Sequence, residues 1–167
     1  SPTWWWERMV QDCLSPMVQA LRTNAHAHIT LALHGSSTEQ LYEHGYQAIL
    51  EELSDACVRG QIEFAETTYT PLALPFVSWD EAMRQIKKNH EVNRTYVGSG
   101  YSPVGFFLPY GAYHRAGAEL LASLGYRWIL LDSTSSPTQA SSGAMILQGI
   151  PHLRCVSRSR EATLALI

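Results

Sequence analysis

One strand–helix–strand segment in the second half of the chain restricts the fold more than any other. An apolar run at 104–108 ends in Pro-Tyr-Gly, residues that interrupt a strand and permit a sharp turn. Apolar residues then recur at helical spacing until Gly125, and a second apolar run at 126–131 ends at Asp132. Two parallel strands joined by one helix place Tyr110 and Asp132 at the same edge of a sheet, the edge where α/β proteins bind ligands.

The composition indicates one globular unit. The chain has 167 residues, 46% of them hydrophobic and 16% charged, enough to bury one sizeable core, so we expect a single domain over residues 1–167. A net charge of −3 with scattered basic residues argues against nucleic-acid binding. Because no apolar run approaches the length of a membrane span, we expect a soluble cytoplasmic protein. Its three widely spaced cysteines favour buried free thiols over disulfides or zinc.

The remaining elements alternate between helices and strands. Strands are predicted at 29–33 and 61–67, and a pair of strands or one hairpin at 145–150 and 153–156. Helices are predicted at 4–22 with a kink at Pro16, at 38–59 with Thr38 as N-cap, from Ser78 to about Asn89, and from Ser157 onward. This order indicates a parallel sheet wrapped by helices.

Three consecutive tryptophans, Trp4, Trp5 and Trp6, lie near the start of the chain. They cannot all face one core, so at least one is expected to meet solvent or a partner. We therefore consider two interpretations: the segment docks a protein partner, or it is an irregular cap over the core.

Six segments in collinear order, over about residues 15–165, resemble glycoside hydrolase family 57, whose distorted (β/α)7 barrel is shared with polysaccharide deacetylases. They are Ile-Thr-Leu-Ala-Leu-His-Gly at 29–35, Val-Arg-Gly-Gln-Ile-Glu at 58–63, Tyr-Thr-Pro-Leu-Ala-Leu-Pro at 69–75, Gln-Ile at 85–86, Gly-Phe-Phe-Leu-Pro at 105–109 and Leu-Gly-Tyr-Arg-Trp-Ile-Leu-Leu-Asp at 124–132. The resemblance implies an α/β fold, a parallel-stranded (β/α)7-type barrel that is incomplete here, and a retaining glycoside hydrolase acting on α-glucans.

The chain departs from the family pattern where the chemistry lies. The family's nucleophilic glutamate is replaced by Tyr110, and Thr70 stands where the family's loop has a histidine. The family's first-strand histidine motif has no counterpart. Read as a deacetylase instead, Phe-Leu-Pro-Tyr-Gly at 107–111 resembles an Arg-Pro-Pro-Tyr-Gly motif, but the Asp-Asp strand end and the His-x-x-x-His metal pair are missing. We therefore predict no metal site and no cofactor.

The catalytic candidates are Asp132, Tyr110 and Glu63. Retaining hydrolysis needs two carboxyl groups about 5–5.5 Å apart. The resemblance places Asp132 as the acid, although a turn residue after the strand is an alternative. Tyr110 needs an adjacent base to act as nucleophile, and Glu63 is a nearby acidic candidate unless it faces solvent.

The candidate substrate-binding residues are two histidines at predicted strand and turn ends and three aromatic residues that offer stacking surfaces: His34, His114, Tyr69, Phe107 and Trp128. An oligo- or polysaccharide is the expected ligand. Two functions therefore remain: a divergent glycoside hydrolase, or a catalytically inactive barrel that serves as a binding or structural subunit.

Overall fold

The computed structural model describes residues 3–132, 144–147 and 149–158. Within these residues, a six-stranded sheet has the order β1-β2-β3-β4-β6-β5. The strands are β1 (Ile29–Ala32), β2 (Ile62–Glu66), β3 (Gly105–Phe107), β4 (Trp128–Asp132), β5 (Ala144–Leu147) and β6 (Ile150–Arg158). All neighbouring pairs are parallel except β5 with β6, which form a hairpin. The predicted parallel sheet and hairpin are thus confirmed.

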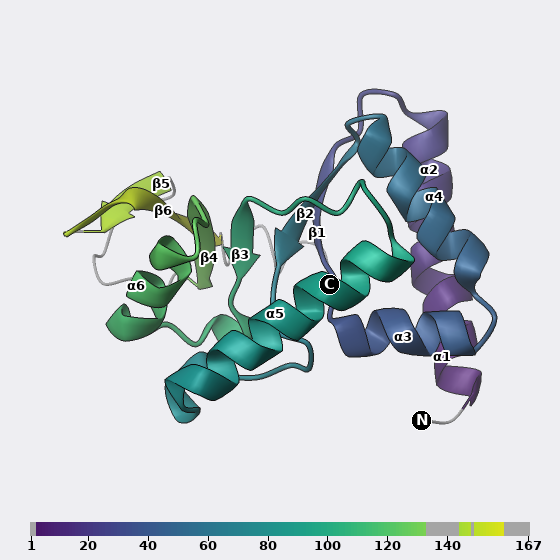
Figure 1. Ribbon diagram of the computed structural model, residues 1–167. Helices are drawn as coiled ribbons and strands as arrows, with labels where there is room; N and C mark the ends of the chain where they lie inside the picture. The colour runs from purple at the N-terminus through teal and green to yellow at the C-terminus, as the bar shows by residue number, and fades with distance from the viewer. Residues whose placement is uncertain (1–2, 133–143, 148, 159–167) are drawn as a thin grey trace.

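The helices cover one face of this sheet. They are α1 (Thr3–Met9), a π-helical turn (Val10–Leu14), α2 (Ser15–Thr23), α3 (Gly35–Glu43), α4 (Gln47–Val58), α5 (Trp79–Tyr96) and α6 (Arg115–Ser123). Strands β1 to β4 lie side by side in chain order, so right-handed crossovers place every connecting helix on the same side. Figure 1 shows α5 running across the sheet on that side. Parallel strands in chain order with all connecting helices on one side are typical of a (β/α) barrel. The described sheet does not close on itself, as predicted for an incomplete barrel.

Two helix boundaries differ from the sequence prediction. The helix predicted at 38–59 is two helices, because Gly45 adopts φ +85° and ends α3. Thr38 is not an N-cap: it lies buried inside α3 and its hydroxyl donates to Asn93 Oδ1 at 2.6 Å. Ser78 is the N-cap of α5 as expected, but the helix continues past Asn89 to Tyr96.

The chain ends also differ in part from expectation. A π-helical turn divides the helix predicted at 4–22 into α1 and α2 and ends at Leu14, two residues before Pro16. The predicted helix from Ser157 is wrong at its start, since β6 continues to Arg158, and its remainder lies outside the described residues. Of the cysteines, Cys155 is buried and Cys57 is half-buried, but Cys13 is exposed, contrary to prediction.

The three tryptophans divide between core and surface. Trp6 is buried and stacks on His44, with ring centroids 6.2 Å apart. Trp4 and Trp5 remain more than half exposed and pack edge to face against each other. The prediction that all three cannot face one core is confirmed, and docking of a partner through Trp4 and Trp5 stays a prediction.

A buried polar cluster joins the helices to the end of β2. Glu66 is fully buried, and its Oε1 accepts hydrogen bonds from Asn89 Nδ2 at 2.5 Å and from the Tyr101 hydroxyl at 2.8 Å. Asn89 also accepts from the backbone N–H of Gly35, the first residue of α3. His90 Nδ1 donates to the second carboxyl oxygen of Glu66 at 2.9 Å. This cluster sets how α5, α3 and β2 meet.

The stability of the fold should therefore depend on the protonation of His90. The hydrogen bond to Glu66 raises the pKa of His90 above its usual value near 6.5. A raised pKa in the folded state contributes stability that is complete below about pH 6.5 and is lost as pH rises through the folded value. The melting temperature should accordingly fall as pH rises from about 6 to 9, and His90→Gln should flatten that fall. Thermal melts at matched ionic strength check this, and an equal fall in both proteins would contradict it.

Candidate functional site

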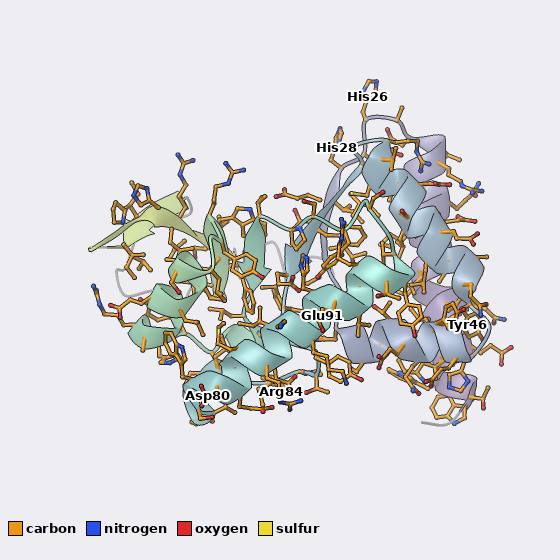
Figure 2. The ribbon with its side chains drawn as sticks, in the orientation of Figure 1. His26, His28, Tyr46, Asp80, Arg84 and Glu91 are labelled. Atoms are coloured by element: carbon orange, nitrogen blue, oxygen red, sulfur yellow. The ribbon has the colours of Figure 1, made fainter. Side chains whose placement is uncertain are left out.

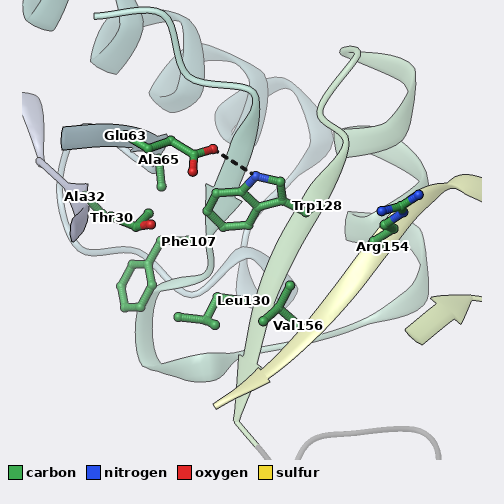
Figure 3. Close-up of a pocket in the computed structure, with 9 residues that line it drawn as sticks. All are labelled: Thr30, Ala32, Glu63, Ala65, Phe107, Trp128, Leu130, Arg154 and Val156. Carbon is green, nitrogen blue, oxygen red and sulfur yellow. Dashed lines mark hydrogen bonds between the residues drawn. The ribbon is translucent and has the colours of Figure 1, made fainter. Parts of the chain in front are cut away.

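The sheet face opposite the helices forms a hollow. It is lined by nine residues from β1, β2, β3, β4 and β6, which we call the open face: Thr30, Ala32, Glu63, Ala65, Phe107, Trp128, Leu130, Arg154 and Val156. The hollow has a volume of about 650 Å³ (Figure 3). These residues alternate with buried ones such as Phe64, Phe106 and Ile129, because successive side chains of a strand point to opposite faces. Three residues predicted to be functional, Glu63, Phe107 and Trp128, thus meet on one surface.

Trp128 is the central side chain of the open face. Its indole N–H donates to Glu63 Oε1 at 3.3 Å (Figure 3). Its register partner in β3 is Gly105, and a Cβ at Gly105 would lie only 1.8 Å from the indole ring. The ring therefore lies over the backbone of β3, and only glycine at position 105 leaves room for it. Phe107 and Leu130 pair one level further along the strands.

The strand register separates Glu63 from the other catalytic candidates. Ala65, Gly105 and Trp128 lie side by side on β2, β3 and β4. Glu63 lies two residues before this level on β2, and Asp132 lies four residues after it on β4, so the two are six residues apart along the strand direction. At about 3.3 Å per residue, the two positions lie about 20 Å apart along the strands. A retaining pair needs about 5–5.5 Å. Glu63 therefore does not form such a pair with Asp132, and a catalytic role for Glu63 stays a prediction.

Tyr110 lies at the carboxyl edge of the sheet in a strained conformation. It sits in the 3₁₀ turn Pro109–Gly111, and its φ of 61° is positive, a conformation that non-glycine residues rarely adopt. Such strain is often found at functional sites. Its side chain is 76% exposed, however, so water surrounds most of the ring, whereas a nucleophilic tyrosine needs an adjacent base.

Asp132 is the last residue of β4, in register with Arg158 of β6. Trp128 and Leu130, which lie four and two residues before Asp132 on the same strand, both belong to the open face. The backbone of Asp132 therefore lies at the carboxyl edge of the sheet, the same edge as Tyr110. Its side chain lies outside the described part of the structure, so its role as an acid stays a prediction.

The remaining candidates hold the loops at the carboxyl edge. His34 precedes α3, and its Nδ1 donates to the Thr68 carbonyl at 2.6 Å, which joins the ends of β1 and β2. His114 precedes α6, where its ring packs against Gly117 so closely that a Cβ there would lie 2.6 Å from it. Both rings thus have structural contacts at the edge where ligands are expected.

Tyr69 packs between α3 and α5. Its hydroxyl donates to Glu39, and Lys88 Nζ lies 3.6 Å from the ring centroid. The hydrogen bond to Glu39 is the main cause that raises the pKa of Tyr69 above its usual value near 10. Because Lys88 covers one face of the ring, Tyr69 offers less stacking surface to a sugar than Trp128 does.

Two features of the site were missed from the sequence. Arg154 is not among the predicted site residues, although Leu153 and Cys155 are buried and His152, Arg154 and Val156 alternate with them. Glu66 is not predicted as a structural residue, yet it points to the same side of β2 as Ile62 and Phe64 and so faces the helices, where it binds His90. Among the described residues, no three His, Cys, Asp or Glu side chains gather closely enough to hold a metal ion.

Comparison with known proteins places this fold. The model of glycosyl hydrolase family 57 matches residues 6–159. The chain belongs to glycosyl hydrolase family 57. This confirms the resemblance noted in the sequence. No curated protein matches the chain.

Several solved structures share the fold of this chain. The 4-alpha-glucanotransferase of Thermococcus litoralis matches 99% of this chain with a TM-score of 0.86 and 14% identity. The alpha-amylase AmyC of Thermotoga maritima matches 96% with a TM-score of 0.72 and 12% identity, and the GH57-type branching enzyme of Pyrococcus horikoshii matches 96% with a TM-score of 0.57 and 18% identity. This family 57 chain covers only 27%, 42% and 33% of those chains, respectively. At such identities the likeness concerns the fold alone.

No helix among the described residues is long and apolar enough to cross a membrane.

Proposed function

We propose that the chain binds α-glucan on the open face of its sheet and does not carry out a retaining double displacement with its own residues. The observation that carries this proposal is the placement of Trp128 and Phe107 together in a hollow of about 650 Å³. A pocket with an apolar lining and a few polar groups is the usual form of a small-molecule site. Here Thr30, Glu63 and Arg154 are the polar groups, and they supply donors and acceptors for sugar hydroxyls.

Family membership and the structural neighbours support a carbohydrate ligand. The neighbours include a 4-alpha-glucanotransferase and an alpha-amylase, which by name act on α-glucans. Three points support the absence of double displacement: the resemblance places Tyr110 where the family has its nucleophilic glutamate, that side chain is 76% exposed, and Glu63 lies about 20 Å along the strands from Asp132. The chain would then serve as a binding or structural subunit.

Binding of maltoheptaose, measured by isothermal titration calorimetry, tests the proposal. Trp128→Ala and Phe107→Ala should each weaken binding about tenfold or more, since each removes a large apolar contact surface worth at least about 1.5 kcal/mol. Trp79→Ala is the control, because Trp79 is an exposed tryptophan at the start of α5 and does not line the hollow. Unchanged affinity in both open-face variants, with circular dichroism intact, would refute the proposed site.

Catalysis by Asp132 is the second candidate function. The observation that favours it is the backbone position of Asp132 at the carboxyl edge of β4, beside the strand that leads to Tyr110. Hydrolysis of labelled α-glucans and maltooligosaccharides should be compared in the parent chain and Asp132→Asn. Turnover that disappears in the variant would establish an acid and require a nucleophile from elsewhere. No turnover in either protein would leave binding as the function.

A further inference from the structure

A second pocket lies at the amino-terminal end of the strands. It has a volume of about 460 Å³, and its walls include Arg127, Trp128, Pro151, His152 and Arg154, with Glu63 at its edge. Arg127 directly precedes β4, and Pro151 and His152 open β6. This is the end of the molecule that carries His28, opposite the end where Asp80 lies in the first turn of α5 (Figure 2). We call it the amino-end pocket; it is remote from the edge that carries Tyr110 and Asp132.

Two arginines line this pocket: Arg127, the residue before β4, and Arg154 in β6. The backbone N–H of Arg154 donates to the carbonyl of Arg127 at 2.9 Å, so the two residues are neighbours across the sheet. Within the described part of the chain, neither guanidinium takes part in an ion pair. The exposed imidazole of His152 adds a third potential donor.

Glu63 does not neutralise these arginines. Its carboxyl group accepts the indole N–H of Trp128 at 3.3 Å. Figure 3 shows Arg154 on the other side of the indole ring, pointing away from Glu63. The whole chain carries a net charge of −3, so the local excess of positive charge here runs against the overall balance. A local field of that kind attracts anions.

We infer that the amino-end pocket binds a sugar phosphate, with the phosphate held by Arg127, Arg154 and His152 and the sugar ring against Trp128 and Pro151. Guanidinium groups bind phosphate oxygens through paired, charge-assisted hydrogen bonds, and two of them suit a dianion better than a monoanion. Glu63 accepts hydrogen bonds from hydroxyl groups of the ring. The pocket thus has basic side chains that bind the phosphate, an apolar surface for the sugar ring and a carboxylate that accepts hydrogen bonds from its hydroxyl groups.

Calorimetric titration of the whole chain with glucose 6-phosphate, inorganic phosphate and glucose tests this inference. Glucose 6-phosphate should bind most tightly, inorganic phosphate more weakly and glucose without detectable affinity. Arg127→Gln should weaken the binding of glucose 6-phosphate about tenfold or more. Binding should also weaken as salt concentration rises.

Arg127 is the decisive variant because it lines only the amino-end pocket, whereas Arg154 and Trp128 also line the open face. Arg84→Gln is the matched control: Arg84 is bound to Glu81 on α5, at the far end of the molecule (Figure 2). Equal binding of glucose 6-phosphate by the parent and Arg127→Gln, or equal loss in Arg84→Gln, would overturn the inference. Equal affinities for inorganic phosphate and glucose 6-phosphate would overturn the role of Trp128 and Pro151 as a ring wall. Maltoheptaose binding that persists in Arg127→Gln would separate this site from the open face.

Discussion

Replacing Asn89 by leucine is expected to lower the free energy of unfolding by about 3–5 kcal/mol, the largest effect of any single change considered for this chain. The Asn89 side chain is fully buried and makes hydrogen bonds in three directions. Its amide nitrogen donates to Glu66 Oε1 at 2.5 Å and to the Leu33 carbonyl at 3.2 Å, and its oxygen accepts from the backbone of Gly35. Leucine has a similar volume, but it would leave the buried N–H of Gly35 without its partner and would remove one donor each from Glu66 Oε1, which keeps Tyr101, and from the Leu33 carbonyl, which keeps Asn93.

The free energy of unfolding should be measured by urea denaturation of the parent chain and Asn89→Leu. Lys87→Leu is the matched control, because Lys87 lies on the same helix with its side chain 78% exposed. That control should change stability by less than about 0.5 kcal/mol. A loss below about 1 kcal/mol in Asn89→Leu would mean that water or a rearranged helix satisfies the cluster, contrary to the structure.

Replacing Gly105 by alanine is expected to destabilise the chain by about 1–3 kcal/mol although it adds a single methyl group. Alanine is ordinarily no worse than glycine in a strand, so propensity alone predicts little change. The structure predicts a cost because the new Cβ would lie 1.8 Å from the Trp128 ring, which must then leave the backbone of β3. Movement of the ring would also disrupt the hydrogen bond from its N–H to Glu63.

A double-mutant cycle identifies the cause of that loss. If the clash with the indole is responsible, Gly105→Ala should cost little in a Trp128→Ala background, and the coupling between the two changes should reach about 1–3 kcal/mol. Urea denaturation of the four proteins gives this coupling. Additive losses would show that position 105 requires glycine for its backbone rather than for Trp128.

The strand–helix–strand segment was predictable because its signals are local. Pro109 and Gly111 interrupt the strand, and Gly125 ends α6 with a φ of +90°. The same rule applied to Gly45 would have divided the helix predicted at 38–59, since a glycine with positive φ ends α3 there. Helix boundaries of this kind can therefore be read from single residues.

The extent of α5 was not predictable in this way. Asparagine is a poor helix former, so a helix ending near Asn89 was a reasonable expectation. The helix continues because Asn89 and Asn93 are fully buried and bind the Leu33 carbonyl. Those partners are more than 50 residues away in the chain, so tertiary contacts rather than local propensity decide where α5 ends.

The candidate site was predictable only in part, because residue type does not show which side of a sheet a residue faces. Phe107 and Trp128 were named for their aromatic rings, and both line the open face. Glu63 was named for its acid, but register places it far from Asp132, and that register depends on pairing with β3 and β4. Alternation along β6 could have found Arg154, since its neighbours in the chain are apolar and buried.

The most direct test of glucan binding on the open face is a two-dimensional ¹H–¹⁵N spectrum of the indole N–H groups during titration with maltohexaose. The chain has five tryptophans, and each reports on a different place: Trp4 and Trp5 on α1, Trp6 in the core, Trp79 at the start of α5 and Trp128 in the hollow. We expect the Trp128 signal, assigned by its loss in Trp128→Phe, to shift with the sugar while the other four stay in place. Shifts at Trp4, Trp5 or Trp79 with an unchanged Trp128 signal would contradict the account.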